Sequence, residues 1–191
     1  MNNKTNLLSK FKFLFKRSIV IVIIGDEKES AEVKIIKLLN IYFKNKKEFL
    51  IFTADNKNIN NLKFFLKLSK KPIFVITEIK ALQKNISDVI DSLTRKTNLV
   101  LSIDIPIIER IRKTTDAETL TFGFSQESDF TIINDDASLK IDYKGSIIPT
   151  WLKTKSKEET YSVLSSLVIG FILGLNLVEI SQIFKKDNIS L

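Results

Sequence analysis

Hydrophobic and polar positions follow two alternating patterns between residues 18 and 113. Short runs rich in β-branched residues, such as Ser18–Ile24, predict strands that are buried on both faces of a parallel sheet. Between them lie longer segments, such as Glu29–Lys44, in which apolar residues recur at helical spacing. Further strands are expected at Phe49–Thr53, Ile73–Thr77 and Leu99–Ile103, and further helices at Asn60–Lys70, Ile86–Leu93 and Ile107–Lys113. This alternation predicts an α/β fold of βαβ units, with helices flanking a parallel sheet.

After Thr121 the helical pattern stops and the apolar runs become shorter. Three of them, Phe130–Asn134, Leu139–Tyr143 and Ile147–Leu152, are separated only by short polar turns. Closely spaced strands joined by such turns are typical of hairpins. We therefore expect a small antiparallel sheet near the C-terminal part of the chain.

An uncharged stretch from Tyr161 to Val178 raises the question of a membrane span. It is 18 residues long, but serines, glycines and Asn176 interrupt its apolar character. The Gly174-Leu175-Asn176 sequence is typical of a helix C-terminus, and a second helix is expected over Val178–Lys185. We expect a buried helix here and no transmembrane span.

Residues 1–17 differ from the rest of the chain because they are basic and contain no acid. As a helix, this segment would place Leu7, Phe11 and Leu14 on one face, with lysines on the other. Such a basic amphipathic helix can lie on an anionic membrane surface, but the pattern favours an entry helix packed on its own domain. We treat 1–17 as a basic amphipathic N-terminal segment and 18–191 as one domain.

Composition narrows the chemistry available to the chain. Its 191 residues are 44% hydrophobic, with no Cys and no His. Disulfide frameworks, thiolate metal sites and histidine general bases are therefore excluded. The net charge is +8, but only Arg17, Arg95, Arg110 and Arg112 among the 30 basic residues are arginines, the side chain best suited to nucleic acids. We expect neither a nucleic-acid partner nor a bound metal.

The segment Gly25–Ala31, which lies between a buried strand and a helix, has the layout of a phosphate-binding loop. Such a loop needs glycines, a lysine for the phosphates and a hydroxyl for Mg²⁺. Here only Gly25 and the hydroxyl of Ser30 match those needs, because Asp26, Glu27 and Glu29 bring three acids into the loop. The pattern predicts a P-loop-like fold with a degenerate nucleotide site.

Several stretches in order make this layout more specific. They are Ile23–Ser30, Phe74–Ile79, Leu99–Pro106, Leu120–Phe124 with Ser128–Asp129, and Glu158–Leu175. With them the chain resembles, over roughly residues 18–186, the central ATPase domain of the Mur ligases, the ATP-dependent amide ligases of peptidoglycan precursor synthesis. The resemblance is closest to the D-alanyl-D-alanine-adding branch.

The resemblance implies that this chain has lost most of the functional residues of the Mur ligases. The second glycine of the family's loop falls on Lys28, its lysine on Glu29 and its metal-binding hydroxyl on Ser30. The adenine-contacting Asn falls on Ser102, whereas Asp104 keeps the first acid of an acidic pair. The His-Asn pair that opens the late helix falls on Glu158–Glu159. The resemblance thus leaves Gly25, Ser30 and Asp104 as candidate cofactor-binding residues and implies no catalytic residue.

These observations predict a non-catalytic Mur-ligase-like module, a pseudoenzyme of the bacterial cytoplasm linked to peptidoglycan precursor synthesis. It would need no cofactor and would act by binding a cell-wall ligase, or the inner membrane face through residues 1–17. The chain is also too short for the family's flanking substrate domains, so we expect these to be missing. The alternative is an ATP- and Mg²⁺-binding component of a Mur-type amide ligase whose other domains come from a partner chain.

Overall fold

A computed structural model describes residues 18–43, 48–77, 84–135, 138–150 and 156–185. The strands are β1 (Ile19–Ile24), β2 (Phe49–Ala54), β3 (Pro72–Ile76), β4 (Asn98–Ser102), β5 (Glu118–Gly123), β6 (Phe130–Asp135), β7 (Ser138–Tyr143) and β8 (Ser146–Pro149). The helices are α2 (Lys28–Tyr42), the short 3₁₀ helix η2 (Ile59–Leu62), α3 (Lys63–Leu68), α4 (Lys84–Ile90), α5 (Ile108–Thr114), α6 (Lys157–Ile172) and α7 (Leu177–Lys185).

All eight strands form one sheet in the order β2-β1-β3-β4-β5-β6-β7-β8. The pairings from β2 through to β6 are parallel, and those of β6 with β7 and of β7 with β8 are antiparallel. The chain runs from β1 to β2 on one side of β1, and then crosses to β3 and β4 on the other side. The carboxyl ends of β1 and β3 therefore form the switch point at which open α/β sheets commonly bind ligands.

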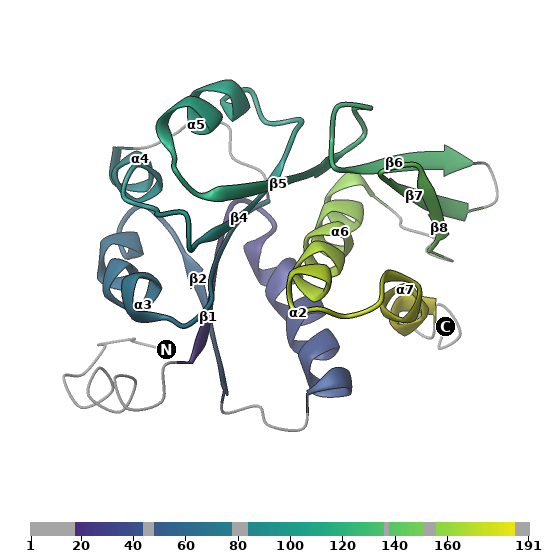
Figure 1. Cartoon of the computed structure of the whole chain (residues 1–191), viewed down its shortest axis with the longest axis horizontal. Coiled ribbons are helices and arrows are strands. Elements are labelled where there is room, and N and C mark those ends of the chain that lie inside the picture. Colours follow the sequence, from purple (N-terminus) through teal and green to yellow (C-terminus); the bar gives the residue numbers. More distant parts are fainter. Residues whose placement is uncertain (1–17, 44–47, 78–83, 136–137, 151–155, 186–191) are drawn as a thin grey trace.

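The sheet is covered on both faces, which makes three layers (Figure 1). One face packs against α2, α6 and α7, in a core that includes Ile21, Leu38 and Leu167. The other face packs against α3, α4 and α5, in a core that includes Val22, Phe65 and Val89. β1 contributes to both cores because every residue of it is buried, as expected of a strand between two helical layers.

The α/β class and the parallel sheet predicted from the sequence are confirmed. The antiparallel strands are also present, but they extend the main sheet, because β6 pairs in parallel with β5 before it turns to β7. β5 itself was not predicted from the sequence. Its polar residues Glu118, Thr119 and Thr121 hide the strand pattern, and pairing with β4 fixes it.

The described helices contain none that is long and apolar enough to cross a membrane. The uncharged stretch instead forms most of α6, in which the run from Tyr161 to Gly170 is buried. The predicted basic segment 1–17 lies outside the described residues.

Candidate functional site

The loop that joins β1 to α2 lies at the switch point of the sheet. Gly25 has a φ of +121°, which only glycine adopts without strain. Asp26 and Glu27 follow, and α2 begins at Lys28. On the neighbouring strand, the Thr77 backbone N–H and hydroxyl both donate to the carbonyl of Ile24, at 3.0 and 3.2 Å. The loop is thus held at the carboxyl ends of β1 and β3.

The charges of this loop oppose an anion. Asp26 and Glu29 are exposed, and Glu27 is half-buried at the start of α2. The Lys28 ammonium lies 3.9 Å from the Glu29 carboxylate, so the loop's one lysine is paired with an acid of the same loop. Within about 4 Å of a phosphate, and at an effective dielectric near 20, each carboxylate would cost about 4 kcal/mol. The acids of this loop therefore oppose a phosphate bound close to them.

The third candidate, Asp104, follows β4 and forms part of a hydrogen-bonded cluster. Its Oδ2 accepts from the backbone N–H of Phe124 at 3.2 Å and from the hydroxyl of Tyr161 at 2.5 Å. Its own N–H donates to Ser102 Oγ at 3.2 Å. Tyr161 lies in the first turns of α6 and is 1% exposed. The carboxylate therefore ties α6 to the ends of β4 and β5.

Aromatic rings surround this tie. The Tyr161 ring lies 5.8 Å from that of Phe122 and 5.9 Å from that of Phe124. The Lys157 ammonium lies over two of the rings, with its Nζ 5.1 Å from the centroid of Tyr161 and 6.0 Å from that of Phe124. Phe124 is 40% exposed, so one ring remains open to solvent. The cluster stacks and positions side chains around the Asp104 carboxylate.

Gly123 explains why the carboxylate fits. A Cβ at this position would lie 2.6 Å from Asp104 Oδ2 and 2.7 Å from Ile103 Cγ2, which is closer than real contacts allow. Glycine here leaves the space that the Asp104 carboxylate occupies. The glycine in the Leu120–Phe124 stretch, one of those that carry the resemblance, thus has a packing explanation.

A second acid in the resemblance, Asp129, also has a structural role. Its Oδ2 accepts from the Thr121 backbone N–H at 2.8 Å and from the Thr121 hydroxyl at 2.9 Å. In return the Thr121 hydroxyl accepts from the Asp129 backbone N–H at 3.0 Å. This reciprocal pairing fixes the start of β6 beside β5.

The N-terminus of α6 carries two acids, Glu158 and Glu159, at the positions where the Mur-ligase resemblance would place a His-Asn pair. Ser156 caps the helix, because its hydroxyl accepts from the Glu159 backbone N–H at 3.1 Å. The pKa of Glu158 is lowered by its backbone hydrogen bond first, and then by the Ser156 hydroxyl. Glu158 is exposed, and both acids are placed favourably for the helix dipole.

The structure places the predicted candidates on one edge but not in one site. Gly25 and Ser30 belong to the β1–α2 junction, and Asp104 follows β4, with β3 between the two strands. Two strand spacings amount to about 10 Å. Tyr161, Phe124 and Lys157, which surround Asp104, were missed by the sequence reasoning. In the sequence only the capping pattern Ser156-Lys157-Glu158-Glu159 marks that helix start.

No family model and no curated protein matches the sequence. Solved structures do match. The UDP-N-acetylmuramate:L-alanyl-gamma-D-glutamyl-meso-diaminopimelate ligase from Neisseria meningitides has a TM-score of 0.69 at 10% identity, over 93% of this chain and 68% of the ligase. The chain has a Mur-ligase fold. The D-alanyl-D-alanyl ligase from Acinetobacter baumannii has a TM-score of 0.66 at 10% identity, over 92% of this chain and 47% of the ligase.

A third Mur-ligase structure, MurF from Thermotoga maritima in complex with ADP, has a TM-score of 0.60 at 12% identity, over 88% of this chain and 49% of the ligase. The chain thus spans about half the length of two of these Mur ligases and two thirds of the third. Because Mur ligases with different substrates match with similar TM-scores, the similarity does not single out the D-alanyl-D-alanine-adding branch.

Proposed function

We propose that this chain is a non-catalytic binding module with a Mur-ligase fold, linked to peptidoglycan precursor synthesis. The observation that carries the proposal is the β1–α2 loop. It keeps Gly25 and the switch-point position, yet it carries three acids and its lysine is paired with Glu29. In this reading the fold is used to bind a partner, which is either a cell-wall ligase or, through residues 1–17, the inner face of the membrane.

A second candidate function is the ATP-binding component of a cell-wall amide ligase completed by a partner chain. One observation favours it: Ser30 lies half-buried in the first turn of α2, where a metal-binding hydroxyl is expected in such a loop. Gly25 and Ser30 would then hold the nucleotide together with backbone amides.

Titration with ATP·Mg²⁺ separates the two functions. A ligand that binds only the native state raises its stability by RT ln(1 + [L]/Kd). For the binding module we expect millimolar ATP·Mg²⁺ to leave the melting temperature unchanged and to produce no heat in calorimetry. Micromolar binding would refute the non-catalytic proposal and establish the second function.

The loop itself is tested by the double variant Lys28→Gly/Glu29→Lys, which removes the Glu29 carboxylate and moves the loop's ammonium from position 28 to position 29. We expect measurable ATP·Mg²⁺ binding in this variant and still no ligase turnover. The matched control is Glu32→Gln, which adds the same net charge one turn further along α2 and should not bind. If the double variant is folded by circular dichroism yet binds no better than the wild type, the loop is not a degenerate phosphate site.

A further inference from the structure

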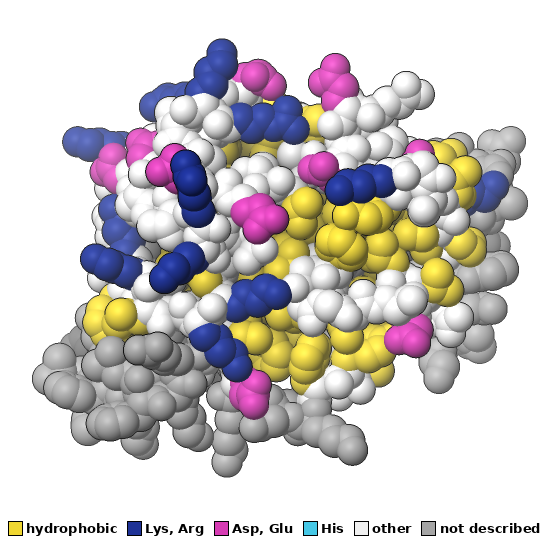
Figure 2. All heavy atoms as spheres, viewed as in Figure 1, with side chains coloured by type: hydrophobic (Ala, Val, Ile, Leu, Met, Phe, Trp, Pro, Cys, Tyr) yellow, Lys and Arg dark blue, Asp and Glu magenta, His cyan; other side chains and the backbone are white. Residues whose placement is uncertain are grey.

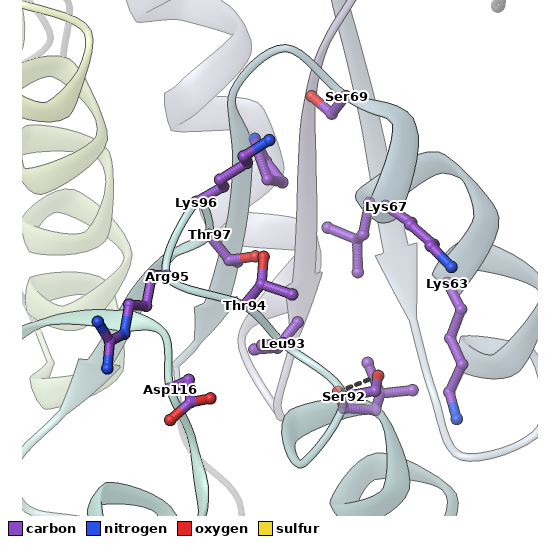
Figure 3. Close-up of a pocket in the computed structure, with 13 residues that line it drawn as sticks. Lys63, Lys67, Ser69, Ser92, Leu93, Thr94, Arg95, Lys96, Thr97 and Asp116 are labelled. Carbon is purple, nitrogen blue, oxygen red and sulfur yellow. Dashed lines mark hydrogen bonds between the residues drawn. The ribbon is translucent and has the colours of Figure 1, made fainter.

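A cavity opens at the opposite edge of the sheet from the β1–α2 loop. It has a volume of about 830 Å³ and lies between α3 and the segment that runs from the end of α4 to the start of β4 (Figure 3). Pro72 and Thr97, at the amino ends of β3 and β4, line it. Its apolar lining comes from Leu66, Pro72, Val89 and Leu93. This cavity is therefore separate from the switch point.

Four cationic side chains line the cavity, against one carboxylate. They are Lys63, Lys67, Arg95 and Lys96, and the carboxylate is Asp116. Figure 3 shows the two α3 lysines on one side and Arg95 and Lys96 on the other. Within the described part of the chain, none of the four forms an ion pair with an acid. Figure 2 shows Lys and Arg concentrated over the half that carries α3, α4 and α5, with Asp and Glu among them.

The hydroxyl groups that line the cavity differ in whether they are already engaged in hydrogen bonds within the protein. The Ser69 hydroxyl donates to the carbonyl of Ser18 at 2.9 Å and accepts from the Val20 N–H at 3.1 Å, so it fixes the wall to β1. The Ser92 hydroxyl donates to the Val89 carbonyl at 2.7 Å. The Thr94 side chain makes no hydrogen bond among the described residues, and Figure 3 shows it between the two cationic sides. The unpaired cations and Thr94 are thus the groups left to hold a ligand.

We propose that this cavity binds a phosphate ester that carries an apolar portion. The lysines supply compact charges and Arg95 a planar fork, and both recognise phosphate oxygens. The apolar lining accommodates the rest of the molecule. Such a ligand is either the head group of an anionic phospholipid or a soluble phosphorylated compound. The chain enters β1 at this same edge, where the Ser69 hydroxyl donates to the Ser18 carbonyl.

The test uses the full chain and three probes: inorganic pyrophosphate, dihexanoyl phosphatidic acid as a dispersed monomer, and vesicles of phosphatidylcholine with or without phosphatidylglycerol. Amide chemical shifts locate binding by the soluble probes, and sedimentation measures binding to vesicles. We expect phosphatidic acid to shift the amides of residues 92–97 and to bind more tightly than pyrophosphate, because only it fills the apolar part.

The variant Lys63→Gln/Lys67→Gln removes two cations from one wall and keeps good helix formers in α3. We expect it to raise the Kd for phosphatidic acid at least tenfold. The matched control Lys34→Gln/Lys57→Gln removes the same charge from positions that do not line the cavity, and it should change the Kd less than twofold. Circular dichroism verifies the fold of both variants.

The outcomes also separate the two sources of the ligand. Binding to phosphatidylglycerol vesicles that the cavity variant weakens identifies a lipid head group, whereas phosphatidic acid binding without vesicle binding identifies a soluble phosphate ester. The proposal is overturned if no soluble probe shifts residues 92–97, if the shifts fall on residues 25–30, or if the control variant weakens binding as much as the cavity variant does.

Discussion

Removing the Tyr161 hydroxyl should measurably destabilise the fold. Its hydrogen bond to Asp104 is 2.5 Å long and joins α6 to the end of β4, across 57 residues of sequence. A hydrogen bond to a charged group contributes about 1.5–3 kcal/mol, and the exposure of Asp104 reduces that value through solvent screening. Because Tyr161→Phe keeps the buried ring and its contacts, we expect a loss of about 1–2 kcal/mol.

Urea unfolding of the wild type and of Tyr161→Phe measures this loss as a lower midpoint at an unchanged slope. For a chain of this size, the same change corresponds to a melting temperature lower by about 2–8 °C. Tyr143→Phe is the matched control. Its ring stacks on that of Phe130 with centroids 4.6 Å apart, and its hydroxyl makes no hydrogen bond within the described residues. The control should stay within about 0.5 kcal/mol of the wild type.

A double-mutant cycle assigns the loss to the Asp104 carboxylate. Asp104→Ala removes the same hydrogen bond from the other side, so the variant with both changes should lose less than the sum of the single losses, by about 1 kcal/mol. If the losses in unfolding free energy of the two single variants add within about 0.3 kcal/mol, the Tyr161–Asp104 hydrogen bond contributes nothing to stability.

Three further predictions test other features of the fold. Gly123→Ala would place a Cβ 2.6 Å from Asp104 Oδ2, so thermal unfolding should show a loss of about 1–3 kcal/mol; an unchanged stability would mean that this space is not needed. Ser156→Ala should cost about 1 kcal/mol, and an unchanged stability would refute the cap; the pKa of Glu158 should also move up toward its ordinary value in an NMR titration, and an unmoved pKa would exclude a contribution of the Ser156 hydroxyl to it. Burial, and to a smaller extent the charge of Glu179, raises the pKa of Tyr42 above its ordinary value of 10.0. The folded state therefore holds the hydroxyl proton more tightly than the unfolded state does. The stability that this contributes is present below pH 10.0 and is lost as the pH rises through the raised pKa. Glu179→Gln should lower that pKa in an ultraviolet titration, with Tyr42→Phe identifying the signal, and no change would exclude the charge effect.

The strands were predictable where burial alone dictates the residues. β1 and β3 lie inside the sheet with helices on both faces, so their residues are apolar throughout. β5 was missed because its polar residues Thr119 and Thr121 break the apolar strand pattern. Their hydroxyls are satisfied by the Ala117 carbonyl and by Asp129, and these pairings cannot be recognised from the sequence. The pair of Thr121 and Asp129 brings β6 beside β5, and for that reason the antiparallel strands join the main sheet.

The candidate site was predictable only in its chain-local parts. The glycine after β1 and the acid after β4 follow strands, so their positions at one edge of the sheet could be expected from the sequence. The partner of Asp104 could not, because Tyr161 is far away in the chain and an isolated tyrosine in an apolar helix looks like a core residue. The cavity cations are equally hidden, since Lys63 and Arg95 come from separate elements that only the fold brings together.

The two edges of the sheet use their polar residues differently, and this difference bears on where ligands bind. At the carboxyl-end edge, Asp104 and Asp129 are engaged by Tyr161 and Thr121, and Thr77 is engaged by the β1 backbone. Groups that already hold the fold together are costly to redirect to a ligand, because each would leave a broken hydrogen bond behind. At the amino-end edge the cavity's cations have no acidic partner within the described residues, so a phosphate would gain their interactions without displacing any. The acids at the carboxyl-end edge therefore repel an anion, whereas the cations at the amino-end edge attract one.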